Sequence, residues 1–204
     1  MNIPSTNRIE AFSDGVIAII ITILVLELHV PQLAEQFSKQ DLLHALKELA
    51  PKLIAYAFSF LVIAIFWVNH HNFFHHLTHA DAGLLWHNNH LLFWLSLVPL
   101  PTAFIGEHPF SHAANVGYAF VMLCAALSFT LMSQHAMYKG KLMAETIDNQ
   151  QKKAIIRRSL VGPALYACGL LAALLYAPAA WLFFIAVPLY FFRPKHIQHQ
   201  NKTT

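Results

Sequence analysis

The stretch RIEAFSDGVIAIIITILVLE, residues 8–27, decides how the rest of the chain is interpreted. It is mostly apolar and long enough for a helix that crosses a bilayer, which takes about 20 residues. We expect this first span to run from Arg8 to Val30, because Pro31 lacks an amide donor and disfavours helix before it. Glu10 and Asp14 stand where a signal peptide would be basic, and no small-residue cleavage site follows, so the sequence predicts a retained helix.

The composition predicts that the whole chain is a membrane protein. Of 204 residues, 57% are hydrophobic and only 11% are charged, whereas about a quarter of a soluble domain is charged. Such a chain cannot cover a water-facing surface, which excludes a cytosolic enzyme and a nucleic-acid-binding module. Six apolar stretches would use roughly 120 residues, and we expect one all-α domain of six transmembrane helices over residues 1–204. The spans are predicted at Arg8–Val30, Leu42–Phe66, Leu84–Ile105, Val116–Met137, Ile155–Tyr176 and Trp181–Phe192.

The basic residues predict the orientation, because cytoplasmic connections are enriched in Lys and Arg. With six spans, Arg8, the connection after the fourth span and the C-terminal tail lie on one side of the membrane. The loops around Glu107 and Pro178 lie on the opposite side and contain neither Lys nor Arg. We therefore expect both termini to be cytoplasmic in the cell (inner) membrane. The basic residues of that connection and tail are Lys139, Lys141, Lys152, Lys153, Arg157, Arg158, Arg193, Lys195 and Lys202; the exceptions on the opposite side are Lys39, Lys47 and Lys52.

The first span has two different faces when it is drawn as a helix with 100° per residue. Ser13 and Asp14 lie about 120° and 140° from Ile19, on the polar side of the helix. A carboxylate inside a span is costly and usually faces protein or water, so Asp14 is expected to bond to neighbouring helices. The other face is an aliphatic stripe with a single hydroxyl, formed by Ile19, Thr22, Ile23 and Leu26, with Phe12, Gly15 and Arg8 close to the same line.

Three segments together resemble the transmembrane protein 175 potassium-channel family, the bacterial relatives of the endolysosomal potassium channel. The most specific is Arg8-x3-Phe12-Ser13-Asp14-Gly15-Val16, followed by an aliphatic helix that contains Thr22. The second span adds Trp67-x3-His71, and the run from Asn89 to Thr102 is similar to the family's third helix. The resemblance covers the whole six-span plan, but its specificity lies in residues 8–30.

The resemblance implies a homotetramer whose first helices line a central pore that potassium ions cross, with no cofactor. Its partners would then be the lipid bilayer, the permeant ions and copies of itself, and not nucleic acid. The family narrows its pore with bulky aliphatic side chains, which correspond here to Ile19, Ile23 and Leu26, with Thr22 as a hydroxyl layer. Its inter-helix polar network maps onto Arg8, Ser13, Asp14, Trp67 and His71.

A mechanism follows from these positions. A narrow ring of isoleucines loses water readily, and dewetting blocks ions. A small rotation or outward shift of the first helix would widen the ring, and potassium sheds its hydration more easily than sodium. The Asp14 network would hold the rotational setting of the helix.

Two other functions remain open at this stage. His71, His75 and His79 recur every four residues, so a helical face could offer them to a metal, and the histidine pattern loosely resembles that of membrane di-iron enzymes. A secondary transporter is the second alternative, although Pro99, Pro101, Pro163 and Pro188 do not fall in matching halves as inverted repeats would require. Cys124 and Cys168 are interpreted as small apolar residues.

Overall fold

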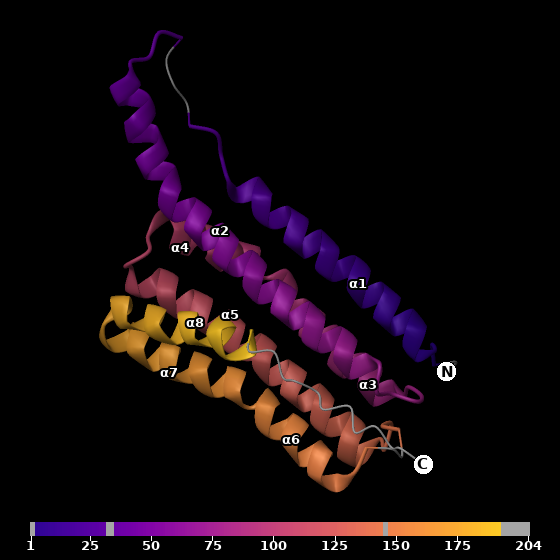
Figure 1. The fold of residues 1–204 in the computed structure, drawn as a ribbon. Helices are drawn as coiled ribbons and strands as arrows, with labels where there is room; N and C mark the ends of the chain where they lie inside the picture. Colours follow the sequence, from indigo (N-terminus) through magenta and orange to yellow (C-terminus); the bar gives the residue numbers. More distant parts are fainter. Residues whose placement is uncertain (1–2, 32–34, 145–146, 193–204) are drawn as a thin grey trace, which may run out of the picture.

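The computed structural model describes residues 3–31, 35–144 and 147–192, and these ranges are almost entirely helical. Figure 1 shows the elements in chain order. They are α1 (Thr6–Ile23), a 3-10 turn η1 (Leu24–Glu27), α2 (Lys39–Phe74), α3 (Ala82–Ser96), α4 (Pro99–Glu107), α5 (His112–Gln134), a π-helical turn η2 (His135–Lys139), α6 (Asn149–Ser159), α7 (Val161–Leu175) and α8 (Ala177–Phe191).

The predicted membrane-spanning helical architecture is confirmed, although the helix at the sixth predicted span is short. Five helical segments of the described chain are long and apolar enough to cross a bilayer, while α8 is apolar but has only 15 residues. The basic tail beyond Phe192, including Arg193, Lys195 and Lys202, lies outside the described residues.

Proline explains why two of the predicted spans are each divided into two helices. The third span breaks at Leu97–Val98, directly before α4, where Pro99 occupies the first helical turn and needs no amide donor. The fifth span breaks at Leu160, between α6 and α7. Pro163 cannot donate to the carbonyl of Ser159 four residues earlier. That carbonyl instead accepts a hydrogen bond from the Thr130 hydroxyl of α5, at 2.9 Å.

The helices form two groups with α5 between them. α7 packs on α5 and α8, whereas α1 contacts α2 and α3, and α3 in turn packs on α5. In Figure 1, α1 therefore lies on one flank of the molecule and α7 with α8 on the other. The largest fully buried side chains, Tyr118, Tyr166 and Phe184, fill the space between α5, α7 and α8.

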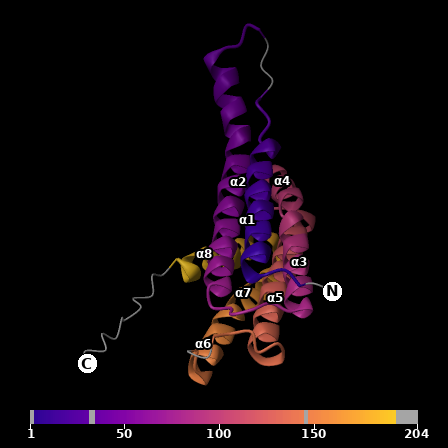
Figure 2. The ribbon, with the colours of Figure 1, turned by 90° about the vertical axis from the view of Figure 1, so that its right-hand side faces the viewer.

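Helix α2 is much longer than the bilayer requires. Its 36 residues rise by about 54 Å, against about 30 Å of hydrocarbon. A capping box starts it, since the Ser38 hydroxyl accepts from the Asp41 amide and the Asp41 carboxylate accepts from the Ser38 amide. Figure 2 shows the N-terminal part of α2 standing alone above the other helices.

Candidate pore helix and its polar anchor

One face of α1 is exposed in the single chain. Ile19 is 59% exposed, Ile23 39% and Leu26 70%, and the Thr22 side chain is exposed beside them. The Thr22 hydroxyl donates to the Ile19 carbonyl, 2.8 Å away, and so keeps its oxygen lone pairs free. The aliphatic stripe is therefore not covered by the chain's own helices. That it faces a central pore in an assembly remains a prediction.

The C-terminal end of the first span differs from the expectation. The helix does not continue to Val30: α1 ends at Ile23, and Leu24–Glu27 form a 3-10 turn, which takes 3.0 residues per turn. Leu26 consequently lies about 60° away from the direction that a continuous α-helix would give it, close to the line of Ile23. The order of residues along the stripe is unchanged.

The opposite face of α1 is buried against the protein. Its side chains recur at three- and four-residue spacing, which defines one stripe of a helix. The members are Ile9, Ser13, Ile17 and Ile20, followed by Leu24 in the 3-10 turn. Four of the five are aliphatic, and Ser13 is fully buried, so its hydroxyl must find a partner inside the protein.

Ser13 finds this partner on α3, in a buried chain of hydrogen bonds that joins three helices. The Asn88 side-chain amide donates to the Ser13 hydroxyl at 2.9 Å, and the hydroxyl donates to the Ile9 carbonyl at 2.8 Å. The Asn88 carbonyl oxygen accepts from His70 Nε2 of α2, also at 2.8 Å. His70 and Asn88 are both fully buried, and the His70 ring stacks on Phe74.

Two further hydrogen bonds tie the same end of α1 to α2. The Trp67 indole donates to the Asp14 carboxylate at 2.9 Å, and His71 Nδ1 donates to the Glu10 carboxylate at 2.8 Å. The Trp67 and His71 rings are stacked one turn apart, with centroids 6.1 Å from each other. We call the residues Glu10, Ser13, Asp14, Trp67, His70, His71 and Asn88 the polar anchor.

The structure thus brings together four of the five residues expected in the polar network. Ser13, Asp14, Trp67 and His71 take part, but His71 contacts Glu10 rather than Asp14. Arg8 is exposed, and its side chain makes no hydrogen bond to any residue within 3–31, 35–144 or 147–192. That all five residues act together as a polar network in an assembled channel remains a prediction.

Sequence reasoning missed Glu10, His70 and Asn88. A signal for Asn88 exists, because it interrupts an apolar face of α3 made of Leu84, Leu91 and Leu95. A polar side chain at such a position is costly unless it is bonded, which marks it as a partner for a polar residue on a neighbouring helix.

The histidine-rich segment does not form the face that was considered for a metal. Helix α2 ends at Phe74, so His75 is its C-cap and His79 lies in the following irregular segment. The three histidines at four-residue spacing therefore do not share one helix. Within the described residues, no group of three or more His, Cys, Asp or Glu side chains is arranged to hold a metal ion.

Comparisons with known proteins identify the relatives of this chain. Residues 8–99 match the profile of a family described as the endosomal/lysosomal potassium channel TMEM175. A potassium channel of Chryseobacterium sp. (strain P1-3) is 35% identical over 96% of this chain and 97% of its own length. A potassium channel of Chamaesiphon minutus is 38% identical over 87% of each chain. The crystal structure of a lysosomal potassium-selective channel TMEM175 homolog from Chamaesiphon minutus superposes with a TM-score of 0.80, at 32% identity over 91% of this chain and 95% of that one.

Proposed function

This chain belongs to the TMEM175 family, and from that membership we propose that it assembles into a channel through which potassium ions cross the membrane. The relatives are named as ion channels and not as enzymes, so its activity is transport and not catalysis. The assembly that we propose is a homotetramer with α1 of each copy next to the central axis. Potassium is the permeant ion, and no cofactor takes part.

The observation that carries this proposal is the division of α1 into an anchored face and an uncovered face. A stripe of large aliphatic side chains on one flank of the subunit is available to copies of itself, while the polar anchor fixes the opposite face to α2 and α3. Among the described residues, the α1 side chains that take part in hydrogen bonds with other helices are those of Glu10, Ser13 and Asp14. This arrangement supports a pore lined by the stripe.

The proposed constriction works by excluding water. Four Ile19 side chains in a ring present only hydrocarbon to an ion, which must then give up hydration without receiving replacement ligands. Ile23 and Leu26 extend the apolar lining toward the outer end of α1. When the ring is narrow the pore loses its water, and when α1 moves outward the pore becomes wet and conducts.

The Thr22 hydroxyl supplies the polar layer of the proposed pore. Because its proton is donated to the Ile19 carbonyl, its oxygen can only accept, and an accepting oxygen is what a cation needs. A ring of such oxygens replaces part of the lost hydration shell. This favours the ion that gives up its hydration at lower cost, which is potassium relative to sodium.

The polar anchor has the role of fixing the rotation of α1. Asp14 and Ser13 bond to different helices, so a turn of α1 about its own axis breaks one or both contacts. The aliphatic stripe is thereby kept toward the axis. Asp14→Ala should therefore change ion flux or assembly, and unchanged flux and assembly would disprove this role.

We propose that the N- and C-termini face the cytoplasm and that the protein resides in the cell membrane. Lys152, Lys153, Arg157 and Arg158 all lie on α6, which is at the same end of the molecule as the start of α1. The positive-inside rule assigns that end to the cytoplasm. At the opposite end Lys52 is paired with Glu107, at 3.1 Å, which offsets its charge.

Potassium flux into liposomes tests the pore assignment. Ile19→Ala removes most of the side chain that forms the constriction, and we expect increased flux and reduced preference for potassium over sodium. Thr22→Val removes the accepting oxygen at nearly constant volume, and we expect reduced potassium preference. Ile185→Ala is the matched control, because Ile185 is also an exposed isoleucine but lies on α8, at the other flank. If Ile19→Ala and Ile185→Ala behave alike, α1 does not line the pore.

A further inference from the structure

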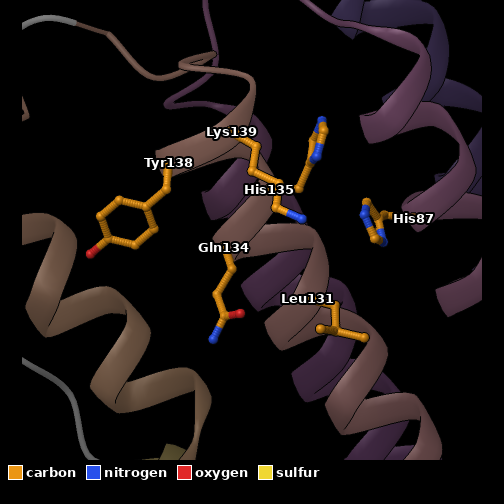
Figure 3. A pocket seen from close by; sticks show the side chains of 6 residues that line it. All are labelled: His87, Leu131, Gln134, His135, Tyr138 and Lys139. Carbon is orange, nitrogen blue, oxygen red and sulfur yellow. The ribbon is translucent and has the colours of Figure 1, made fainter.

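A pocket outside the candidate pore lies where α3 meets the end of α5. It holds about 220 Å³, far more than the roughly 10–15 Å³ that one water molecule needs. Its lining residues are His87 of α3 together with Leu131, Gln134, His135, Tyr138 and Lys139 of α5 and η2. Figure 3 shows the Lys139 ammonium pointing into the space between His135 and His87, while Gln134 and Tyr138 extend from the other side of the helix.

The π-helical turn η2 forms the end of this pocket. It closes with hydrogen bonds from the Gly140 amide to the His135 carbonyl and from the Leu142 amide to the Ala136 carbonyl, both at 2.8 Å. A π turn is a single wide turn within a helix, and such turns frequently occur at functional sites. Here it carries His135 at its start and Lys139 at its end.

His135 is held rigidly against α3. Its Nε2 lies 2.9 and 3.0 Å from the two carboxylate oxygens of Asp81, and Asp81 also caps α3 by accepting from the Leu84 amide. Gly83 has no side chain where the imidazole ring lies, and a Cβ there would collide with it. The His87 ring is 5.1 Å from the His135 ring, so two imidazoles and one ammonium converge on the same space.

This cluster has the chemistry of an anion site. Lys139 brings an ammonium group, and the His87 imidazole offers a ring N–H donor, while Nε2 of His135 is already bonded to Asp81. The nearby carboxylate of Asp81 accepts hydrogen bonds from His135 and from the Leu84 amide, which compensate part of its charge. Burial acts to raise the pKa of Asp81, but these bonds and the neighbouring histidines outweigh burial and lower it.

The surface beside the pocket is apolar. Leu127 and Leu131 are exposed on α5 at four-residue spacing, which places them on one face of the helix. Trp86, which precedes His87, is also exposed. A hydrocarbon track that ends in a cationic, aromatic pocket matches a lipid, whose acyl chain lies along the helix and whose phosphate lies at its end.

We propose that this pocket binds the phosphate-bearing headgroup of an anionic phospholipid, with Lys139 and His87 contacting the phosphate and Leu127 and Leu131 contacting an acyl chain. The pocket lies at a depth in the bilayer that suits a lipid headgroup. α5 and η2 together have 28 residues and rise by about 42 Å, so their end extends past about 30 Å of hydrocarbon into the headgroup region. The basic helix α6 lies at the same end, where it adds to the attraction for anionic lipid.

Native mass spectrometry of the purified full chain in detergent tests this proposal. Phosphatidylglycerol, phosphatidylcholine and inorganic phosphate are added separately to the wild type and to the variants Lys139→Gln, His87→Gln and Lys141→Gln. Lys141 is the matched control, because it is exposed two residues beyond Lys139 and does not line the pocket. Size-exclusion chromatography and thermal unfolding establish whether each variant folds. If Lys139→Gln does not fold, the comparison of His87→Gln with the wild type tests the proposal.

We expect phosphatidylglycerol to bind the wild type more tightly than phosphatidylcholine. Because a hydrogen bond to a charged group is lost, Lys139→Gln and His87→Gln should each weaken binding by about tenfold. Lys141→Gln should leave it unchanged. An equal loss of binding in Lys141→Gln would mean that only the overall positive charge of the protein matters. Equal binding of phosphatidylcholine would mean that the charge of the headgroup does not matter. Either result overturns the proposal. Binding of inorganic phosphate that depends on Lys139, without lipid binding, would identify a site for a soluble anion instead.

Discussion

Two adjacent asparagines on α3 allow the polar anchor to be tested with its own control. Asn88 is fully buried and bonds to both Ser13 and His70, whereas Asn89 is half-buried and makes no hydrogen bond through its side chain within the described ranges. The same substitution, Asn→Leu, keeps the number and branching of the side-chain heavy atoms at each site and replaces the polar amide with two methyl groups. Asn88→Leu leaves the His70 Nε2–H and the Ser13 hydroxyl without their partner on α3.

The expected magnitude follows from these two groups. An unsatisfied buried polar group costs about 1–3 kcal/mol, and hydrogen bonds between membrane helices contribute about 0.6 kcal/mol on average and up to about 1.7. We therefore expect Asn88→Leu to lower the free energy of unfolding by about 2 kcal/mol and Asn89→Leu to change it by less than about 0.5 kcal/mol. Reversible unfolding in mixed detergent micelles, followed by circular dichroism, measures both.

A double-mutant cycle with Ser13→Ala separates the contact from the packing. If Asn88 acts through Ser13, the two substitutions together should cost less than the sum of their separate effects. Equal destabilisation by Asn88→Leu and Asn89→Leu, or strict additivity with Ser13→Ala, would refute the view that this bond joins α1 to α3.

Three further predictions follow from contacts described above. Trp67→Phe removes the indole donor to Asp14 but keeps an aromatic ring; because the site is partly exposed, the free energy of unfolding should fall by about 1 kcal/mol, measured in the same micelles. Gly83→Ala should displace the imidazole that lies on α3 and lower the Tm, whereas Gly117→Ala, whose Cβ would meet nothing within 4 Å, should leave it unchanged or raise it. Because folding lowers the pKa of Asp81, its contribution to the stability of the fold is complete above about pH 4 and is lost as the pH falls through the lowered pKa. Thermal melts at a series of pH values should show this loss as a falling Tm, and Asp81→Asn should make the Tm less dependent on pH in that range.

The two faces of α1 could be predicted from the sequence because they depend only on helical geometry and residue type. The periodicity of Ile19, Ile23 and Leu26 defines one stripe whatever the helix packs against. The C-terminal end of this helix could not be predicted in the same way. Pro31 limits how far a helix can extend, but the change to a 3-10 turn at Leu24 depends on packing of that turn against α2 and α4.

The partners of the polar residues were predicted only in part, since they depend on how neighbouring helices are rotated. His70 and His71 are consecutive and therefore point about 100° apart on α2. The sequence pattern singled out His71, which bonds to Glu10, while His70 reaches Asn88 in the core. A rotation of α2 that cannot be determined from the sequence alone decides which of the two histidines is buried.

The α1 residues of the polar anchor lie in the N-terminal half of the helix, whereas the buried side chains beyond them, Ile17, Ile20 and Leu24, are apolar. If α1 swings as a rigid rod about Ser13, the displacement of each residue grows with its distance from that point. A swing of 5° moves Ile19, about 9 Å from the pivot, by roughly 0.8 Å, and moves Leu26, about 20 Å away, by roughly 1.7 Å. In the proposed pore, the same swing would change the opening at Leu26 about twice as much as the opening at Ile19.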